Sequence, residues 1–107
     1  PTEEHNRYLV MKWDFSGVSA SGDAETVTGS LYRYLNLRIR DFTNYYREIL
    51  EDTPHIEPQD AISSFQSLLL LVRKSGHSLY LLIDEYDNFA NELMMGHRNM
   101  EEGRYRA

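Results

Sequence analysis

The feature that most constrains the fold of this chain is an apolar run at residues 79–83 that stops at two acids, Asp84 and Glu85. The run is too short for a free-standing helix and is rich in strand formers, so it predicts a β-strand buried on both faces, as in a parallel sheet. The acids then mark the carboxyl end of that strand. Ligands of open α/β sheets bind at the carboxyl ends of the strands, so these carboxylates are expected at an edge where chemistry takes place.

An apolar strand that ends in Asp-Glu has the pattern of a Walker B strand, which supplies acids to nucleotide sites. In that interpretation Asp84 holds a Mg²⁺ ion through water, and Glu85 polarises the water that attacks the γ-phosphate of ATP. A second interpretation needs no ligand, because a buried strand must pass into solvent and acids are easily accommodated there. The other elements of the chain are needed to choose between the two.

Composition limits the class of protein and its partners. A hydrophobic content of 41% with 12% aromatic residues is enough to build a core for one domain or part of one. The net charge of −6 argues against a general phosphate-backbone binder, so nucleic acid is not the expected partner of this segment. The chain has no cysteine, no signal peptide and no apolar stretch of membrane-span length, so we expect a cytoplasmic protein without a membrane segment.

Apolar spacing predicts a second strand and a long helix before the run. Residues 8–15 are dominated by β-branched and aromatic side chains, and their carboxyl end also carries an acid, Asp14. Residues 24–50 are predicted to form the helix, although Gly29 places the start of its regular part near Ser30. Its apolar face has steps of three and four residues: Val27, Leu31, Leu35, Ile39, Phe42, Tyr46 and Ile49.

A second helix is predicted at 58–75, with Pro58 just inside its start and Gly76 as the cap after its end. Its buried face is predicted to comprise Ala61, Ile62, Phe65, Leu68, Leu69 and Val72. Leucines 68–71 run round the helix, so we expect burial on more than one side. After the apolar run, residues 88–95 have helical spacing and stop at Gly96.

The segment between the first strand and the long helix occupies the place of a phosphate loop. Gly17 and Gly22 even have the spacing of the two glycines in the Walker A pattern. Asp23 and Ala24 stand where that pattern needs Lys and then Ser or Thr, and an acid there would repel a triphosphate. We therefore expect an ordinary connection, with Ser21 or Asp23 as the helix cap.

Two strands joined by a helical hairpin form a crossover unit, which pairs the strands in parallel. The residues 82–87, the preceding Gly76, and the strand 8–15 with its ending Asp-Phe-Ser-Gly resemble the AAA-ATPase-like domain. This is a bacterial and archaeal P-loop family, often followed in the full chain by a nuclease-like domain of the PD-(D/E)XK type. The resemblance covers residues 8–95. It implies that the Walker B strand lies next to the strand that precedes it in sequence.

The chain departs from the family in having no Gly-x-x-x-x-Gly-Lys-[Ser/Thr] sequence. The family carries that loop upstream of the position numbered 1 here, and a sensor strand follows its Walker B strand. We therefore expect an α/β, partial P-loop NTPase-like fold of two parallel strands that lacks both parts. It is predicted as a single partial domain over residues 1–107, with its core at 8–95 and a polar tail at 96–107.

The resemblance implies an ATP and Mg²⁺ site in the parent protein, with Asp84 as the metal-side acid and Glu85 as the catalytic base. Asp87 is a neighbour to which the sequence gives no role. Because the chain supplies only the Walker B half, the isolated fragment is expected to be inactive and to bind neither ATP nor Mg²⁺. No cofactor-binding residue is assigned within it.

Two alternatives stay open. One is a non-enzymatic protein-interaction module whose working surface is the tyrosine-rich helix with Tyr32, Tyr34, Tyr45 and Tyr46. The other is a metal-dependent nuclease that uses Asp84 and Glu85, which is weaker because no lysine follows at the usual one-residue spacing. In the parent fold the strand at 79–83 is expected to be central, paired on one side with residues 8–15 and on the other with the sensor strand. In the isolated chain it would present an unpaired apolar edge, so we expect self-association, exchange of elements with a second copy, or aggregation.

Overall fold

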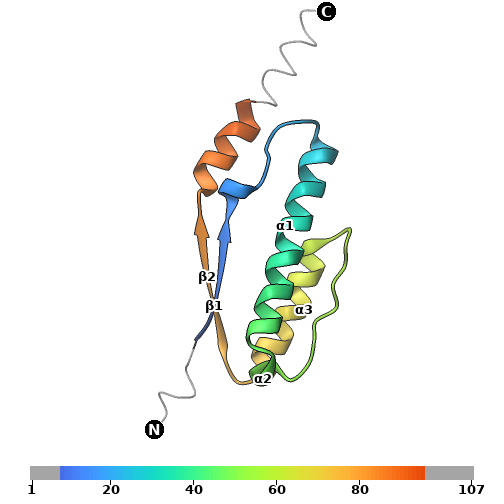
Figure 1. The fold of residues 1–107 in the computed structure, drawn as a ribbon, viewed down its shortest axis with the longest axis vertical. Helices are drawn as coiled ribbons and strands as arrows, with labels where there is room; N and C mark the ends of the chain where they lie inside the picture. The colour runs from blue at the N-terminus through green and yellow to red at the C-terminus, as the bar shows by residue number, and fades with distance from the viewer. Residues whose placement is uncertain (1–7, 96–107) are drawn as a thin grey trace, which may run out of the picture.

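The computed structural model describes residues 8–95 (Figure 1). Two strands enclose three helices, with a short 3₁₀ turn after the first strand, in the order β1 (Tyr8–Asp14), the turn Phe15–Gly17, α1 (Ala24–Tyr45), α2 (Arg47–Leu50), α3 (Ala61–Lys74) and β2 (Ser78–Asp84). Residues 86–95 form a further helix just after β2. The predicted polar tail at 96–107 and the predicted stop at Gly96 lie outside the described residues.

β1 and β2 form a two-stranded parallel sheet. Their register runs from Tyr8 beside Ser78 to Asp14 beside Asp84, so both strands end at the same level. The connection between them is helical, and its helices lie along one side of the sheet (Figure 1). The predicted α/β class, the parallel pair and the helical crossover are therefore confirmed.

The helix boundaries differ from the predicted ones where local hydrogen bonds outweigh propensity. α1 begins at Ala24 with Asp23 as its cap, as predicted, and it is regular from there rather than from near Ser30. The carboxylate of Asp23 accepts a hydrogen bond of 2.8 Å from the amide of Thr26. This cap and the burial of Val27 offset the cost of Gly29. The single predicted helix is also split after Tyr45, and the short α2 follows.

The second long helix begins later than predicted. α3 starts at Ala61 rather than Pro58, because the carboxylate of Asp60 caps the amide of Ser63 at 3.2 Å. Gly76 follows the helix with φ +83°, a conformation that favours glycine. The predicted burial is wrong for Ile62, which is 54% exposed, and Leu70 is 64% exposed, so this part of α3 faces away from the core.

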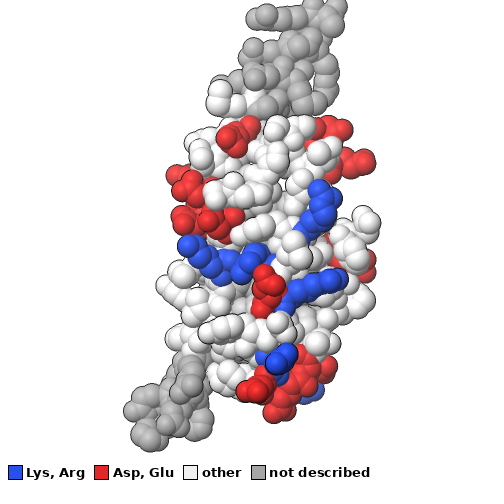
Figure 2. Space-filling model, in the orientation of Figure 1, with Lys and Arg blue, Asp and Glu red and all other residues white. Residues whose placement is uncertain are grey.

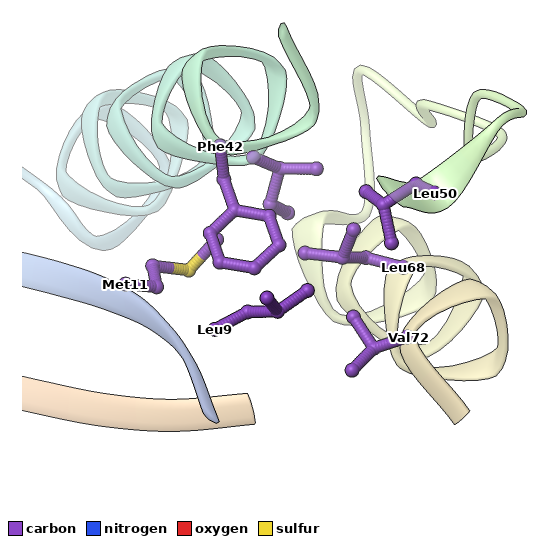
Figure 3. Packing of buried hydrophobic residues seen from close by; sticks show 7 residues of the cluster. Leu9, Met11, Phe42, Leu50, Leu68 and Val72 are labelled. Atoms are coloured by element: carbon purple, nitrogen blue, oxygen red, sulfur yellow. The ribbon is translucent and has the colours of Figure 1, made fainter. Parts of the chain in front are cut away.

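The main core lies between the sheet and the two long helices (Figure 3). It comprises seven buried residues from β1, α1, α2 and α3: Leu9, Met11, Ile39, Phe42, Leu50, Leu68 and Val72. A second cluster surrounds Phe15 and includes Phe89 from the helix after β2, whose ring stacks on that of Phe15 with centroids 5.4 Å apart. This contact fixes the direction in which the chain leaves β2.

The prediction that β2 is buried on both faces is wrong for the described residues. Tyr80 and Leu82 are 54% and 42% exposed, and on β1 Tyr8 and Val10 are 59% and 45% exposed. These alternate positions share one face of the sheet, while the helices cover the other. An apolar run shows that a strand can be buried, but residues 8–95 provide a covering layer for one face only.

Within residues 8–95, none of the helices is both long enough and apolar enough to cross a membrane.

Candidate functional site

The acids selected from the sequence lie at the carboxyl end of the parallel pair. Asp84 ends β2, and its Cα partner on β1 is Asp14, so two aspartates end neighbouring strands at one edge of the sheet. Figure 2 shows acidic side chains gathered where β2 passes into the next helix, with basic side chains adjacent to them. The sequence marked Asp14 as an acid at a strand end, but the parallel register is what brings it beside Asp84.

Asp84 is accessible and has two neighbours. One carboxylate oxygen accepts a hydrogen bond of 3.0 Å from the amide of Glu85, which fixes the side chain close to the backbone. The other lies 3.8 Å from Nζ of Lys12 on β1, and the two side chains are 56% and 57% exposed. An ion pair with this much exposure is weak, so Lys12 can exchange for another cation at little cost.

Glu85 turns the chain between β2 and the following helix. Its φ is +59°, in the left-handed region that non-glycine residues rarely adopt, and its carbonyl accepts the amide of Phe89 at 3.2 Å. Its side chain is exposed. Strained backbone of this kind is often found at functional sites, where surrounding contacts hold it in place.

Asp14 is held more firmly than Asp84. Its carboxylate accepts a hydrogen bond of 3.0 Å from the amide of Ser16. The side chain of Ser16, and then this amide, lower the pKa of the Asp14 carboxyl below its ordinary value. Its own amide donates a 2.7 Å hydrogen bond to the hydroxyl of Tyr34 on α1. Asp14 is therefore ionised at neutral pH and fixed at the edge of the sheet.

The tyrosine-rich helix is divided between two environments. The hydroxyl of Tyr34 accepts the Asp14 amide, and that of Tyr46 accepts the Val10 amide at 3.1 Å, so both tyrosines bind the strand. Tyr45 instead is 80% exposed. The structural use of Tyr34 and Tyr46 was not anticipated from the sequence, although a tyrosine in place of phenylalanine on a core-facing helix is a signal of such a bond.

No group of three or more acids or histidines suited to hold a metal ion occurs among the described residues. The strand ends thus provide two neighbouring carboxylates, Asp14 and Asp84, and the adjacent Glu85. Such a donor set matches Mg²⁺, which usually binds through one or two carboxylates and completes its coordination with water and substrate phosphates. The roles of Asp84 as metal-side acid and Glu85 as base stay predictions.

A family model described as a predicted AAA-ATPase matches residues 1–105. The match spans nearly the whole chain and includes both strands and the acids at their ends. Comparison with curated proteins and with solved structures finds no significant match.

Proposed function

Because this chain belongs to the AAA-ATPase-like family, we propose that its strand ends supply the Walker B half of an ATP and Mg²⁺ site. The observation that carries the proposal is the position of Asp84, exposed at the carboxyl end of an apolar strand whose parallel neighbour ends at the same level. Carboxyl ends of parallel strands are where nucleotides bind in open α/β sheets. The phosphate-binding loop of this site would lie in the parent protein, outside the present residues.

In this proposal each residue has a separate task. Asp84, with Asp14 beside it, would hold Mg²⁺ through water, and the bound ion would neutralise charge on the phosphates. Lys12 compensates the charge of Asp84 when no divalent cation is present, because its ammonium lies 3.8 Å from the carboxylate. Glu85 would orient and polarise the attacking water from the turn that follows the strand.

The proposal is tested in the full-length parent protein by Glu85→Gln, which keeps the shape of the side chain and removes its basicity. We expect nucleotide affinity to be retained and steady-state ATP turnover to be abolished, because only the base is lost. The matched control is Asp87→Asn, an exposed acid two positions further along, which should keep turnover.

Nucleotide binding is followed by calorimetry and turnover by phosphate release. A Glu85→Gln protein that hydrolyses ATP at the normal rate would remove Glu85 from the mechanism. Equal loss of turnover in Glu85→Gln and Asp87→Asn would show that the acids act through general charge rather than through one positioned base.

A further inference from the structure

A small pocket lies between the end of α1, the short α2 and the segment 51–60 that follows α2. Figure 1 shows α2 at the opposite end of the molecule from the carboxyl ends of the strands, so the pocket is separate from Asp84 and Glu85. Its volume is about 250 Å³. Pockets for small-molecule ligands usually measure roughly 300–1,000 Å³, so this one suits one or two side chains of a partner better than a nucleotide-sized ligand.

One wall of the pocket is an irregular segment that the neighbouring helices hold in place. The amides of His55 and Glu57 donate hydrogen bonds of 2.9 and 2.7 Å to the hydroxyls of Ser67 and Ser64 on α3. The side-chain amide of Asn36 on α1 donates to the carbonyl of Glu57 at 3.1 Å. Ser64 and Asn36 are both buried. The wall is therefore formed before any ligand arrives, and binding costs little ordering of the backbone.

The opposite wall carries positive charge that the chain does not neutralise. Arg40 and Arg47 both line the pocket and are exposed, and neither forms an ion pair with a carboxylate among residues 8–95. Asn44 accepts a hydrogen bond of 3.4 Å from Arg47, which orients that guanidinium without cancelling its charge. By contrast, Arg38 on the same helix pairs with Asp41 at 3.1 Å.

The charge of the pocket is opposite in sign to that of the chain as a whole. The chain has a net charge of −6, yet none of the described residues that line this pocket is acidic. Spacing explains how the polar side chains gather, since residues 40, 44 and 47 are separated by steps of four and three and share one face of the helical segment. A cationic pocket in an acidic chain favours an anionic ligand.

The floor of the pocket is apolar. Pro54 is buried, and Ile56 is half-buried and packs against the main core. The hydroxyl of Thr43, which also lines the pocket, donates to the carbonyl of Ile39 at 2.8 Å and is thus already engaged. A ligand that fits both parts needs an apolar group for the floor and a negative charge for the arginines.

We propose that this pocket binds an acidic segment of a partner protein, in which an apolar side chain neighbours a Glu or Asp. The apolar side chain covers Pro54 and Ile56, and the carboxylate meets Arg40 and Arg47, whose forked donors match the shape of a carboxylate. Arginine is also among the residues that contribute most to binding at protein interfaces. The inference rests on this pocket alone and does not depend on the nucleotide chemistry proposed above.

The proposal is tested with the full-length parent protein and an array of acetylated decapeptides. Each peptide carries one leucine or phenylalanine next to one or two glutamates, and its matched peptide carries glutamine instead. The peptides that bind best are then labelled and titrated by fluorescence anisotropy. We expect the glutamate peptides to bind, and we expect affinity to fall when glutamate becomes glutamine, when the apolar residue becomes alanine, and when ionic strength rises.

Variants of the parent protein locate the binding. Arg40→Gln and Arg47→Gln should each weaken the glutamate peptides by about tenfold, because each removes a charge-assisted hydrogen bond. Arg33→Gln is the matched control, since Arg33 is an exposed arginine of the same helix that does not line this pocket. Thermal melts show whether each variant is folded, and if Arg47→Gln melts lower, the comparison of Arg40→Gln with Arg33→Gln decides.

Three results would overturn the proposal. The first is an array in which no acidic peptide binds, and the second is equal affinity for the glutamate and glutamine peptides. The third is a loss of affinity in Arg33→Gln as large as that in Arg40→Gln, because general attraction to the positive charge of α1 would then account for the binding.

Discussion

Two hydroxyl groups determine how β1 is held at its outer edge. Tyr34 and Tyr46 reach the amides of Asp14 and Val10 because α1 runs antiparallel to the strand and alongside it. The sequence shows the tyrosines, and it also shows their helical spacing. Which backbone groups they meet depends on how far α1 projects beyond the edge of the sheet, and that is decided by packing in the assembled core rather than by any local pattern.

Replacing Tyr34 by Phe removes the acceptor of the Asp14 amide and keeps the aromatic ring. We expect unfolding in urea at lower denaturant concentration, with a loss of about 1 kcal/mol, the usual contribution of such a hydrogen bond, and with an unchanged m-value. Tyr45→Phe is the control, since Tyr45 is 80% exposed, and it should unfold like the parent at equal chain concentration. Equal effects of the two changes would mean that the Tyr34 hydroxyl contributes nothing specific.

At the scale of elements, periodicity predicted the strands and helices well, whereas their ends depended on single side chains. The start of α1 is an example, because the weak helix propensity of Gly29 was outweighed by the cap from Asp23 and by burial of Val27. β2 illustrates a different limit. Its apolar run correctly predicted a strand. The exposure of Tyr80 and Leu82 depends on which elements cover each face of the sheet, and the residues of the strand do not specify those elements.

The cap of α1 gives a prediction about pH. The pKa of Asp23 is lowered by its hydrogen bond with Thr26, so the folded state binds a proton less readily than the unfolded state. The stabilisation is therefore complete above the ordinary pKa of 3.8 and is lost as pH falls through the lower folded value.

Asp23→Asn retains an effective capping group without the titration, whereas Asp23→Ala removes the cap. We expect the Asn variant to resemble the parent in Tm at neutral pH and to lose less stability below pH 3.8, and the Ala variant to melt a few degrees lower at neutral pH. Thermal melts followed by circular dichroism at several pH values would measure this. Identical acid sensitivity in the parent and in Asp23→Asn would exclude Asp23 as a contributor.

For the molecule as a whole, the two parallel strands end at the same level in Asp14 and Asp84, and the hydroxyls of Tyr34 and Tyr46 bind the outer edge of β1. The sequence correctly predicted that Asp84 and Glu85 lie at the carboxyl end of a parallel strand, and their roles at a site stay predictions. It did not indicate that Asp14 stands beside Asp84, because that depends on register between strands that lie far apart in the chain. The positive φ of Glu85 could not be read from the sequence either, because it belongs to the turn between β2 and the following helix.

The proposed half-site leads to a prediction about nucleotide affinity. Backbone amides of a phosphate loop and its lysine supply most contacts to a triphosphate, and the present sequence contains no such loop. Asp14, Asp84 and Glu85 on their own repel ATP unless a divalent cation intervenes. We therefore expect calorimetric titration of this chain with ATP and Mg²⁺ to give no saturable heat, while the full-length parent with its loop binds under the same conditions. Saturable micromolar binding by the isolated chain would contradict the assignment of a half-site and would require phosphate contacts from residues other than a Walker A loop.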